Sequence, residues 1–347
     1  MTGEIMSHLT KEQLRTLSVP EMSLVEDRLR ELVQTESQQL GEIAQYILDL
    51  GGKRLRPLLT LLCSDIYGAN LDIRVDIAAA AELIHTASLL HDDVVDEADL
   101  RRGQPSAPNK WGNAKSVLAG DFLFAKAFSI LSAFPGALEI MTDAIAAMCQ
   151  AELSQLGAQY DLRVTADTYV KIIIGKTASL LAASCECGGL ISSMPLEQVD
   201  LLGKYGIHLG LAYQIIDDIG DYVLGTAHSG KNHGNDLKNG TTTLPLLYVL
   251  ADPQSRSRVE SLLAQHQRVE PEMLARELTE TRALERATDV ASKHIGMARE
   301  MLVGLPRCHA TLVLDGLAGA LQERCTTLSN HAPVPQRPGQ PFQYSGT

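Results

Sequence analysis

The sequence predicts an all-α fold, and two observations support this prediction. Apolar residues recur at steps of three and four over most of the 347 residues, which is the period of one face of a helix. No segment shows the alternating pattern between turn residues that is typical of paired strands. Hydrophobic residues make up 45% of the chain and charged residues 21%, so burial of apolar side chains can offset the ordering entropy of a folded core.

The helical period can be followed along the chain. In residues 24–50 the apolar positions Leu40, Ile43 and Ile47 follow one another at three- and four-residue steps, and Gly51-Gly52 ends this predicted helix. The same period returns in residues 57–67, 73–95, 116–131, 138–156, 166–190, 196–222 and 243–250, and it continues through 258–328. No stretch rich in Pro, Ser or Gly separates two halves, so we predict one helical domain over residues 1–330. Prolines among polar residues predict a disordered tail over residues 331–347.

Charge and composition restrict the partners of the chain. Its 42 acidic and 30 basic residues give a net charge of −12, which disfavours binding to phosphate polymers, so we expect no nucleic-acid partner. We see no secretory signal and no apolar run long enough to span a bilayer, and we expect a cytoplasmic protein. The six cysteines lack the spacing of a metal site, so we expect reduced thiols.

Two clusters of aspartates are the clearest chemical signal. Asp92, Asp93 and Asp96 follow one apolar run, and Asp217, Asp218 and Asp221 repeat the same spacing after another. Carboxylates three and four residues apart share a helix face and repel one another. One such cluster is most simply a solvated helix end, but two of them after apolar helices favour a metal site. Carboxylate oxygens suit Mg²⁺, which keeps waters and bridges to substrate phosphates. The two clusters therefore predict a diphosphate held between helices through metal ions.

Basic residues near these clusters in the sequence suit a phosphate ligand. They occur in four short segments, residues 51–57 (GGKRLRP), 101–103 (RRG), 175–177 (GKT) and 230–231 (GK). Arg101 and Arg102 can each clamp a phosphate through two N–H groups. A lone lysine is most simply a solvated surface charge, but several cations close to the aspartates of an acidic chain favour phosphate binding.

These motifs resemble the trans-polyprenyl diphosphate synthase family. The likeness extends over roughly residues 40–250 and contains both aspartate motifs in order, with GGKRLRP, residues 84–96 (IHTASLLHDDVVD), Gly120-Asp121, GKT and residues 243–245 (TLP). The resemblance implies the isoprenoid synthase fold, an all-α bundle around a central cavity, and usually a homodimer. It implies a prenyltransferase that joins isopentenyl diphosphate to an allylic diphosphate such as farnesyl or geranylgeranyl diphosphate, with at most peripheral membrane contact when the product leaves.

The resemblance also implies a role for each matching residue. Asp92 and Asp96 would be ligands of two Mg²⁺ ions and Asp217 of a third, with support from Asp93, Asp218 and Asp221. The diphosphate of isopentenyl diphosphate would be held by Lys53, Arg56, His85 and Arg102. The allylic diphosphate would face Arg101, Lys176, Gln214 and Lys231, with Thr177 close to the reacting carbon. The implied mechanism is ionisation of the allylic C–O bond, attack by the isopentenyl double bond, and loss of a proton to the released diphosphate.

Ala87 and Ser88 carry the expectation for product length. They lie five and four positions before Asp92, about one helical turn below the expected metals. Short-chain members of the family often carry aromatic rings at this level, so two small residues leave the passage open, and bulky residues on the helix over 116–131 would close it deeper. We expect products longer than C20, in the range used for quinone side chains. The simpler alternative is that both residues are small because helices approach closely there.

One position departs from the family pattern, and it leaves alternatives open. Thr241 stands where the family usually has Lys, and a hydroxyl carries no charge, although Lys238 one turn earlier is a candidate substitute. The alternatives are a class I terpene cyclase, which needs no isopentenyl site, and a weakly active or non-catalytic subunit of a heteromeric synthase. A helical phosphohydrolase also begins its metal signature with His-Asp, as in His91-Asp92, but it needs further His ligands and leaves the second cluster unexplained.

Overall fold

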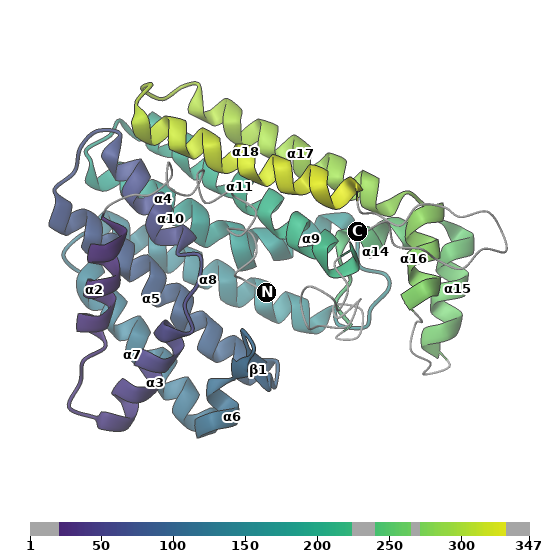
Figure 1. The fold of residues 1–347 in the computed structure, drawn as a ribbon, viewed down its shortest axis with the longest axis horizontal. Helices are drawn as coiled ribbons and strands as arrows, with labels where there is room; N and C mark the ends of the chain where they lie inside the picture. Colours follow the sequence, from purple (N-terminus) through teal and green to yellow (C-terminus); the bar gives the residue numbers. More distant parts are fainter. Residues whose placement is uncertain (1–20, 224–239, 265–270, 331–347) are drawn as a thin grey trace. The chain divides into compact units, whose positions relative to one another are not determined.

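The computed structural model describes residues 21–223, 240–264 and 271–330, and these are almost entirely helical (Figure 1). The prediction of an all-α protein is confirmed. The chain forms two compact units. Unit 1 contains Met1–Ala146, Leu180–Gly206 and Met301–Gly316, and unit 2 contains Ala147–Ser179, Ile207–Glu300 and Leu317–Thr347. The single domain over residues 1–330 stays a prediction, and the tail expected at 331–347 lies outside the described residues.

Unit 1 holds most of the N-terminal helices. Its complete helices are α2 (Met22–Leu32), α3 (Gln38–Asp49), α4 (Leu55–Asp65), α5 (Leu71–Val95), α6 (Ala107–Trp111) and α7 (Asn113–Leu131). A hairpin of two short strands, β1 (Leu100–Arg101) and β2 (Gln104–Pro105), lies between α5 and α6. Nearly all of α10 (Ser179–Ile191) belongs to this unit, as do the first parts of α8 (Pro135–Gly157) and α11 (Leu196–Val223).

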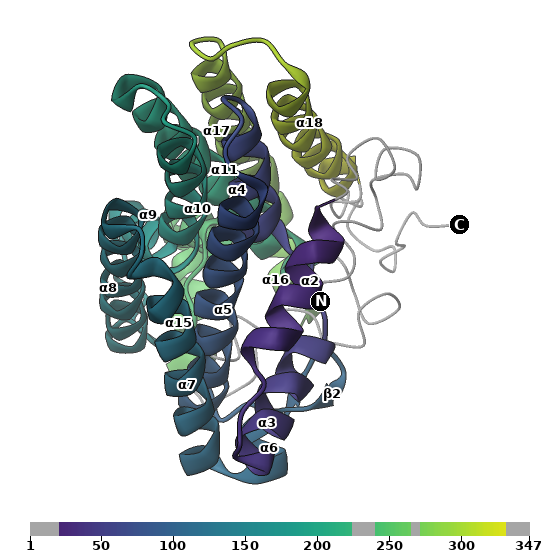
Figure 2. The ribbon, with the colours of Figure 1, turned by 90° about the vertical axis from the view of Figure 1, so that its left-hand side faces the viewer.

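Helix α5 is the central helix of unit 1. Its first turn is capped by Asn70, whose side chain accepts hydrogen bonds from the backbone N–H groups of Asp72 and Ile73. Four consecutive alanines, residues 78–81, are fully buried, and such small side chains let neighbouring helices approach closely. Helices α7, α4 and α2 all pack against α5 (Figures 1 and 2). This packing places the C-terminal end of α5, with the first aspartate cluster, at a defined position.

Unit 2 contains the remainder of α8 and α11 and the elements that carry the second set of expected site residues. Helix α9 (Ala166–Ile173) runs into a single π-helical turn, η1 (Ile174–Ala178). Helices α14 (Leu244–Leu250), α15 (Pro253–Ala264) and α16 (Pro271–Glu280) follow, and most of α17 (Ala283–Leu302) and of α18 (His309–Asn330) completes the unit. The Tyr222 hydroxyl lies 2.7 Å from the Thr243 hydroxyl, so the end of α11 is joined to the start of α14.

The structure corrects two expectations about elements. Residues 24–50 form two helices, which are separated near Ser37. The Ser37 backbone is extended, and its N–H donates to the Thr35 hydroxyl oxygen, a local hydrogen bond that competes with helix formation. The hairpin of β1 and β2 also differs from the expectation of no strands; each strand has two residues, too few to show an alternating pattern. All six cysteines are free thiols, as expected. Among the described helices, none has the length and apolar character needed to cross a bilayer.

Candidate active site

The first aspartate cluster lies in the last turn of α5. Asp92 is half-buried, Asp93 is fully buried and Asp96, the residue that ends the helix, is exposed. The C-terminus of a helix carries partial negative charge, so carboxylates there are repelled both by the helix and by one another. A bound cation would relieve this repulsion, and the location therefore suits a divalent ion.

Arg101 is held against the first cluster by Asp93. The Arg101 Nε donates to Asp93 Oδ1 at 2.8 Å, and its Nη2 donates to the same oxygen. The other oxygen, Asp93 Oδ2, is buried and makes no hydrogen bond within the described residues. Arg101 comes from β1, and the hairpin turn that follows has left-handed backbone at Arg102 (φ 52°) and Gly103 (φ 76°). Asp93 thus orients a guanidinium group and does not extend into solvent as a ligand.

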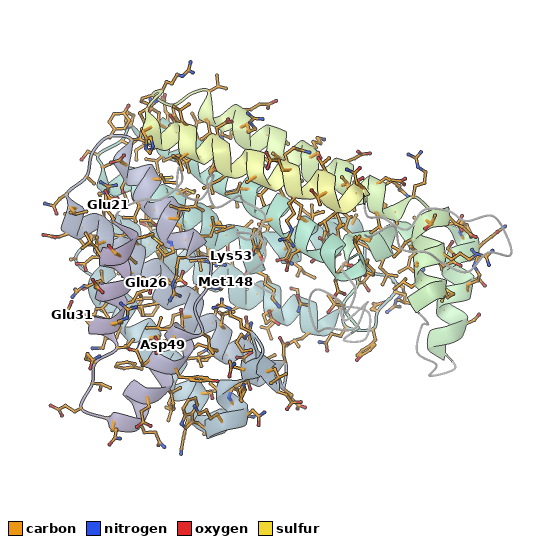
Figure 3. The ribbon with its side chains drawn as sticks, viewed as in Figure 1. Glu21, Glu26, Glu31, Asp49, Lys53 and Met148 are labelled. Carbon is orange, nitrogen blue, oxygen red and sulfur yellow. The ribbon has the colours of Figure 1, made fainter. Side chains whose placement is uncertain are left out.

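Four arginines of unit 1 lie close enough to His85 to affect its ionisation. Burial lowers the pKa of His85 well below its ordinary value of 6.5, and nearby positive charges lower it further. Those charges belong to Arg56, Arg102, Arg101 and Arg54. Three of the four residues expected to bind isopentenyl diphosphate are therefore close together, and the imidazole among them is neutral. The fourth, Lys53, is half-buried in the turn between α3 and α4 (Figure 3).

Two backbone features place Arg102 in this cationic group. The Arg102 Nη1 donates to the carbonyl of Leu50 at the end of α3, 3.3 Å away. A Cβ at Gly52 would lie 3.0 Å from the Arg102 Nη2, so the guanidinium lies close to a backbone that has no side chain there. The GG pair of the GGKRLRP motif therefore does more than end a helix, because it also makes room for Arg102.

The residues upstream of the first cluster are part of the packing of α5. Ala87 is fully buried, and the half-buried Ser88 donates its hydroxyl to the carbonyl of His85 at 2.8 Å. His91 turns toward α7, where its Nε2 lies 3.1 Å from the Val117 carbonyl oxygen, and a Cβ at Gly120 would overlap its ring. Gly120 of the motif is thus explained by helix packing, and His91 by contacts to α7 and not by a phosphohydrolase metal.

Lys176 lies in the π-helical turn of unit 2. A Cβ at Gly175 would lie 2.7 Å from the Ala147 carbonyl oxygen, so glycine is needed for this turn to approach α8. Lys176 Nζ is 2.8 Å from Glu152 Oε2 and 3.3 Å from Gln155 Oε1, both on α8. π-Helical turns occur often at functional sites. Sequence reasoning did not identify Glu152, although an acidic residue on a largely apolar helix is a usable signal.

A chain of hydrogen bonds joins three expected residues to a fourth that the sequence did not reveal. The Thr177 hydroxyl donates to Gln214 Oε1 at 2.7 Å, and Gln214 Nε2 donates to Asp218 Oδ1 at 2.8 Å. The Tyr169 hydroxyl donates to Asp218 Oδ2 at 2.6 Å. The chain therefore holds the side chains of Thr177 and Gln214 in fixed orientations. Tyr169 was not expected, because an aromatic residue on an amphipathic helix is most simply a core residue.

Asp218 has an unusual protonation behaviour. Burial raises its pKa from 3.8 to about 7. The hydrogen bonds from Tyr169 and Gln214 favour the ionised form, whereas the charges of Asp217 and Asp221 oppose it. Asp218 is 6% exposed, while the Asp217 side chain is 42% exposed. Asp217 is thus the accessible carboxylate of the pair, and Asp218 is the one that organises its neighbours.

The second cluster contains two further aspartates. Asp217 and Asp221 are half-buried near the end of α11, and Arg324 Nη2 of α18 lies 3.9 Å from Asp217 Oδ1. Arg324 was not expected from the sequence, because it lies outside every motif. Thr241 is half-buried just before α14. Lys231 and Lys238 lie outside the described residues.

The donor set fits Mg²⁺ bound together with a substrate. Within the described residues, no three His, Cys, Asp or Glu side chains form a complete metal cage. Mg²⁺ usually retains several waters and is held by one or two carboxylates plus phosphate oxygens, so it needs no such cage. Both clusters instead offer partly accessible carboxylates near the negative ends of long helices.

An all-α chain that carries paired aspartate clusters and grouped cations has the features of an isoprenoid diphosphate synthase. The Polyprenyl synthetase family model matches residues 37–280, and the chain belongs to this family. It is therefore a prenyltransferase, and the family expected from the motifs is confirmed.

Individual relatives agree with this assignment. The chain is 36% identical over 300 residues to heptaprenyl diphosphate synthase component 2 of Geobacillus stearothermophilus, covering 86% of this chain and 94% of the relative. It is 37% identical over 258 residues to octaprenyl diphosphate synthase of Escherichia coli, covering 73% and 80%. A solved polyprenyl synthase from Caulobacter crescentus, complexed with calcium and isoprenyl diphosphate, is similar with a TM-score of 0.81 and 35% identity, covering 93% of this chain and 99% of that one.

Proposed function

We propose that this protein condenses isopentenyl diphosphate with an allylic diphosphate and makes a medium- or long-chain all-trans polyprenyl diphosphate. The observation that carries the proposal is the pair of aspartate clusters near the ends of α5 and α11, each with an arginine beside one of its carboxylates. The similar Caulobacter protein was solved in complex with calcium and isoprenyl diphosphate, which supports a divalent ion and a prenyl substrate for this chain.

The aspartates divide into ligands and supporting residues. Asp92 and Asp96 would hold two Mg²⁺ ions and Asp217 a third, because these carboxylates are exposed or half-buried. Asp93 would support them by orienting Arg101, and Asp218 by orienting Gln214, with Asp221 adding negative charge. When bound, Mg²⁺ would supply Lewis-acid stabilisation of the diphosphate that leaves the allylic carbon.

The cations of unit 1 would bind isopentenyl diphosphate. Lys53, Arg56 and Arg102 would contact its phosphates, and His85 would donate a hydrogen bond as a neutral imidazole. Positive charges grouped this closely repel one another, so a bound diphosphate would lower the energy of the group. The terpene cyclase alternative has no need of this group of residues.

A second set of residues would act on the allylic substrate. Lys176, held by Glu152 in this structure, would turn to the allylic diphosphate together with Arg101 and Lys231. Gln214 would face the allylic diphosphate and Thr177 would lie near the reacting carbon, and their polar atoms are fixed by the chain of hydrogen bonds that ends at Asp218. Oriented dipoles of this kind stabilise charge as it develops in the transition state.

Product length and assembly belong to the same proposal. Small residues at Ala87 and Ser88, together with relatives named heptaprenyl and octaprenyl synthase, support products longer than C20. We propose a homodimer located in the cytoplasm. The relative named component 2 supports a different assembly, in which this chain is one subunit of a heteromeric synthase.

One incubation tests the proposal and its alternatives. The purified chain is supplied with Mg²⁺, farnesyl diphosphate and labelled isopentenyl diphosphate, and the dephosphorylated products are separated by chromatography. The proposal predicts labelled all-trans products longer than C20. Cyclic unlabelled hydrocarbon would support a terpene cyclase. No product from the chain alone would overturn a homomeric enzyme, and activity that returns on addition of a partner subunit would establish the heteromer.

A further inference from the structure

Arg54 occupies a strained position between two residues of the expected substrate site. It precedes α4 with φ 49° and ψ 37°, in the left-handed region. For a residue with a Cβ this conformation costs about 1–2 kcal/mol relative to the right-handed one. Such a residue persists only where its surroundings hold it in place. Lys53 precedes it and Arg56 follows two residues later, so the direction of the backbone at Arg54 determines where both side chains point.

The Arg54 side chain joins α2, α3 and α5 to the turn before α4. Its Nε lies 2.6 Å from Glu26 Oε1 on α2, and its Nη1 lies 2.8 Å from Glu82 Oε1 on α5. Its Nη2 donates to the Leu48 carbonyl oxygen of α3 at 3.0 Å. Figure 3 shows Glu26 on α2 and Lys53 in the turn before α4. A guanidinium group can make these bonds simultaneously because its donors form a rigid fork.

The cluster of Arg54, Glu26 and Glu82 is not explained by a contribution to stability alone. The side chains of Arg54 and Glu82 are only 10% and 4% exposed, and burying charges costs several kcal/mol per ion. Glu82 Oε2 is buried and makes no hydrogen bond within the described residues, which adds a further cost. A buried ion pair is weak evidence for stability, so another role accounts better for a cluster of this kind.

The same cluster is connected to the cations that surround His85. Glu82 lies three residues before His85 on α5, so both lie on one side of that helix. Arg54 binds the Leu48 carbonyl at the end of α3, and Arg102 binds the Leu50 carbonyl at the same helix end. The end of α3, the start of α4 and the middle of α5 are therefore fixed relative to one another by Arg54.

We propose that Arg54, with Glu26 and Glu82, is a positioning residue that aims Lys53 and Arg56 at the diphosphate of isopentenyl diphosphate. The inference rests on the proposed function, because it assigns no substrate contact to Arg54 itself. Its effect is confined to one of the two substrates. Displacement of a binding group by about 1 Å can cost about a hundredfold in rate, so loss of the cluster has a measurable effect.

The test compares Arg54→Lys and Glu82→Gln with a matched control, Arg74→Lys. Arg74 is also a buried arginine of unit 1, with Nε 3.1 Å from Ser64 Oγ and Nη1 3.2 Å from Asp65 Oδ1, near the opposite end of α5. We expect the KM for isopentenyl diphosphate to rise about tenfold or more in both test variants. The KM for the allylic substrate should change less than about twofold, and Arg74→Lys should leave both values unchanged despite a similar loss of stability.

Three outcomes would overturn the inference, and one outcome separates it from the proposed function. It is wrong if both KM values rise together, if Arg74→Lys raises the isopentenyl KM equally, or if Arg54→Lys and Glu82→Gln fold and bind isopentenyl diphosphate as the wild type does. Titration calorimetry with isopentenyl diphosphate supplies a binding constant without turnover. If the wild type binds isopentenyl diphosphate but makes no product, the proposed function is wrong. In that case, weaker binding of isopentenyl diphosphate by the variants still supports the positioning role. Glu82→Gln replaces the carboxylate by a neutral amide of nearly the same shape, so it serves if Arg54→Lys fails to fold.

Discussion

Replacing Asp218 by asparagine is expected to stabilise the protein. In the unfolded chain this carboxyl ionises near 3.8, whereas in the folded protein its pKa is raised to about 7, mainly by burial. The folded state therefore keeps a proton that the unfolded chain releases. A pKa that is raised on folding gives stability that is present at low pH and is lost as the pH rises toward 7.

The size of the effect follows from this difference in pKa. About three pKa units at roughly 1.36 kcal/mol each correspond to roughly 4 kcal/mol lost by the wild type at and above pH 7. Asparagine carries no charge and keeps the hydrogen bonds, because its oxygen accepts from Gln214 and its amide can donate to the Tyr169 hydroxyl. We therefore expect Asp218→Asn to raise the free energy of unfolding by roughly 2–4 kcal/mol at pH 8.

Urea unfolding followed by circular dichroism, with chelator present, measures this effect. The advantage of Asp218→Asn should grow by up to about 1.4 kcal/mol between pH 6 and pH 7, and it should level off above pH 7. Asp217→Asn is the matched control, because its side chain is 42% exposed and its replacement should change stability little. A destabilised Asp218→Asn protein at pH 8, or an advantage that does not depend on pH, would refute the reasoning.

The remaining predictions concern binding, product length and acid stability. Thr241→Lys should lower the KM for the allylic substrate or raise kcat by about tenfold to a hundredfold, because a charged hydrogen bond contributes roughly 1.5–3 kcal/mol. Steady-state kinetics should show this change together with an unchanged KM for isopentenyl diphosphate. Unchanged allylic parameters would show that another group already fills the role. Ala87→Phe should shorten the products toward C15 or C20 on chromatography, and unaltered long products would contradict a role for Ala87 in product length. The pKa of His85 is lowered on folding, so below pH 6.5 the unfolded chain takes up the proton before the folded protein does. This lowers the free energy of unfolding of the wild type by up to about 1.4 kcal/mol per pH unit. His85→Asn should remove this contribution and make stability less dependent on pH in this range. Equal slopes for wild type and variant between pH 6.5 and 5.5 would rule this out.

The helices were largely predictable because their burial pattern is regular. The expected helix over 73–95 is α5, Leu71–Val95, and the expected helix over 138–156 is α8, Pro135–Gly157. The break near Ser37 was missed because apolar residues on both sides of it keep the helical period. The hairpin at Leu100–Pro105 was missed because its register is set by the left-handed turn at Arg102, which the residue type does not reveal.

The site was predictable where chemistry recurs in short motifs. The aspartates could be predicted because their spacing has a meaning on a helix, and the cations near His85 because their short motifs resemble those of the family. The roles of Tyr169 and Arg54 could not, because each depends on partners far away in the sequence, Asp218 for the first and Glu26 and Glu82 for the second. Long-range pairs of this kind have no local sequence signature.

The most direct test of the proposed metal site is the condensation rate of Asp92→Ala and Asp217→Ala at saturating Mg²⁺. Both aspartate clusters are proposed to bind the metal ions that stabilise the departing diphosphate. Loss of a metal ligand should therefore reduce incorporation of labelled isopentenyl diphosphate by about a thousandfold or more, equivalent to roughly 4 kcal/mol of transition-state stabilisation. Circular dichroism should show an intact helical fold in both variants, because Asp92 and Asp217 are half-buried and outside the apolar core. A rate close to that of the wild type in either folded variant would contradict the assignment of the metal site.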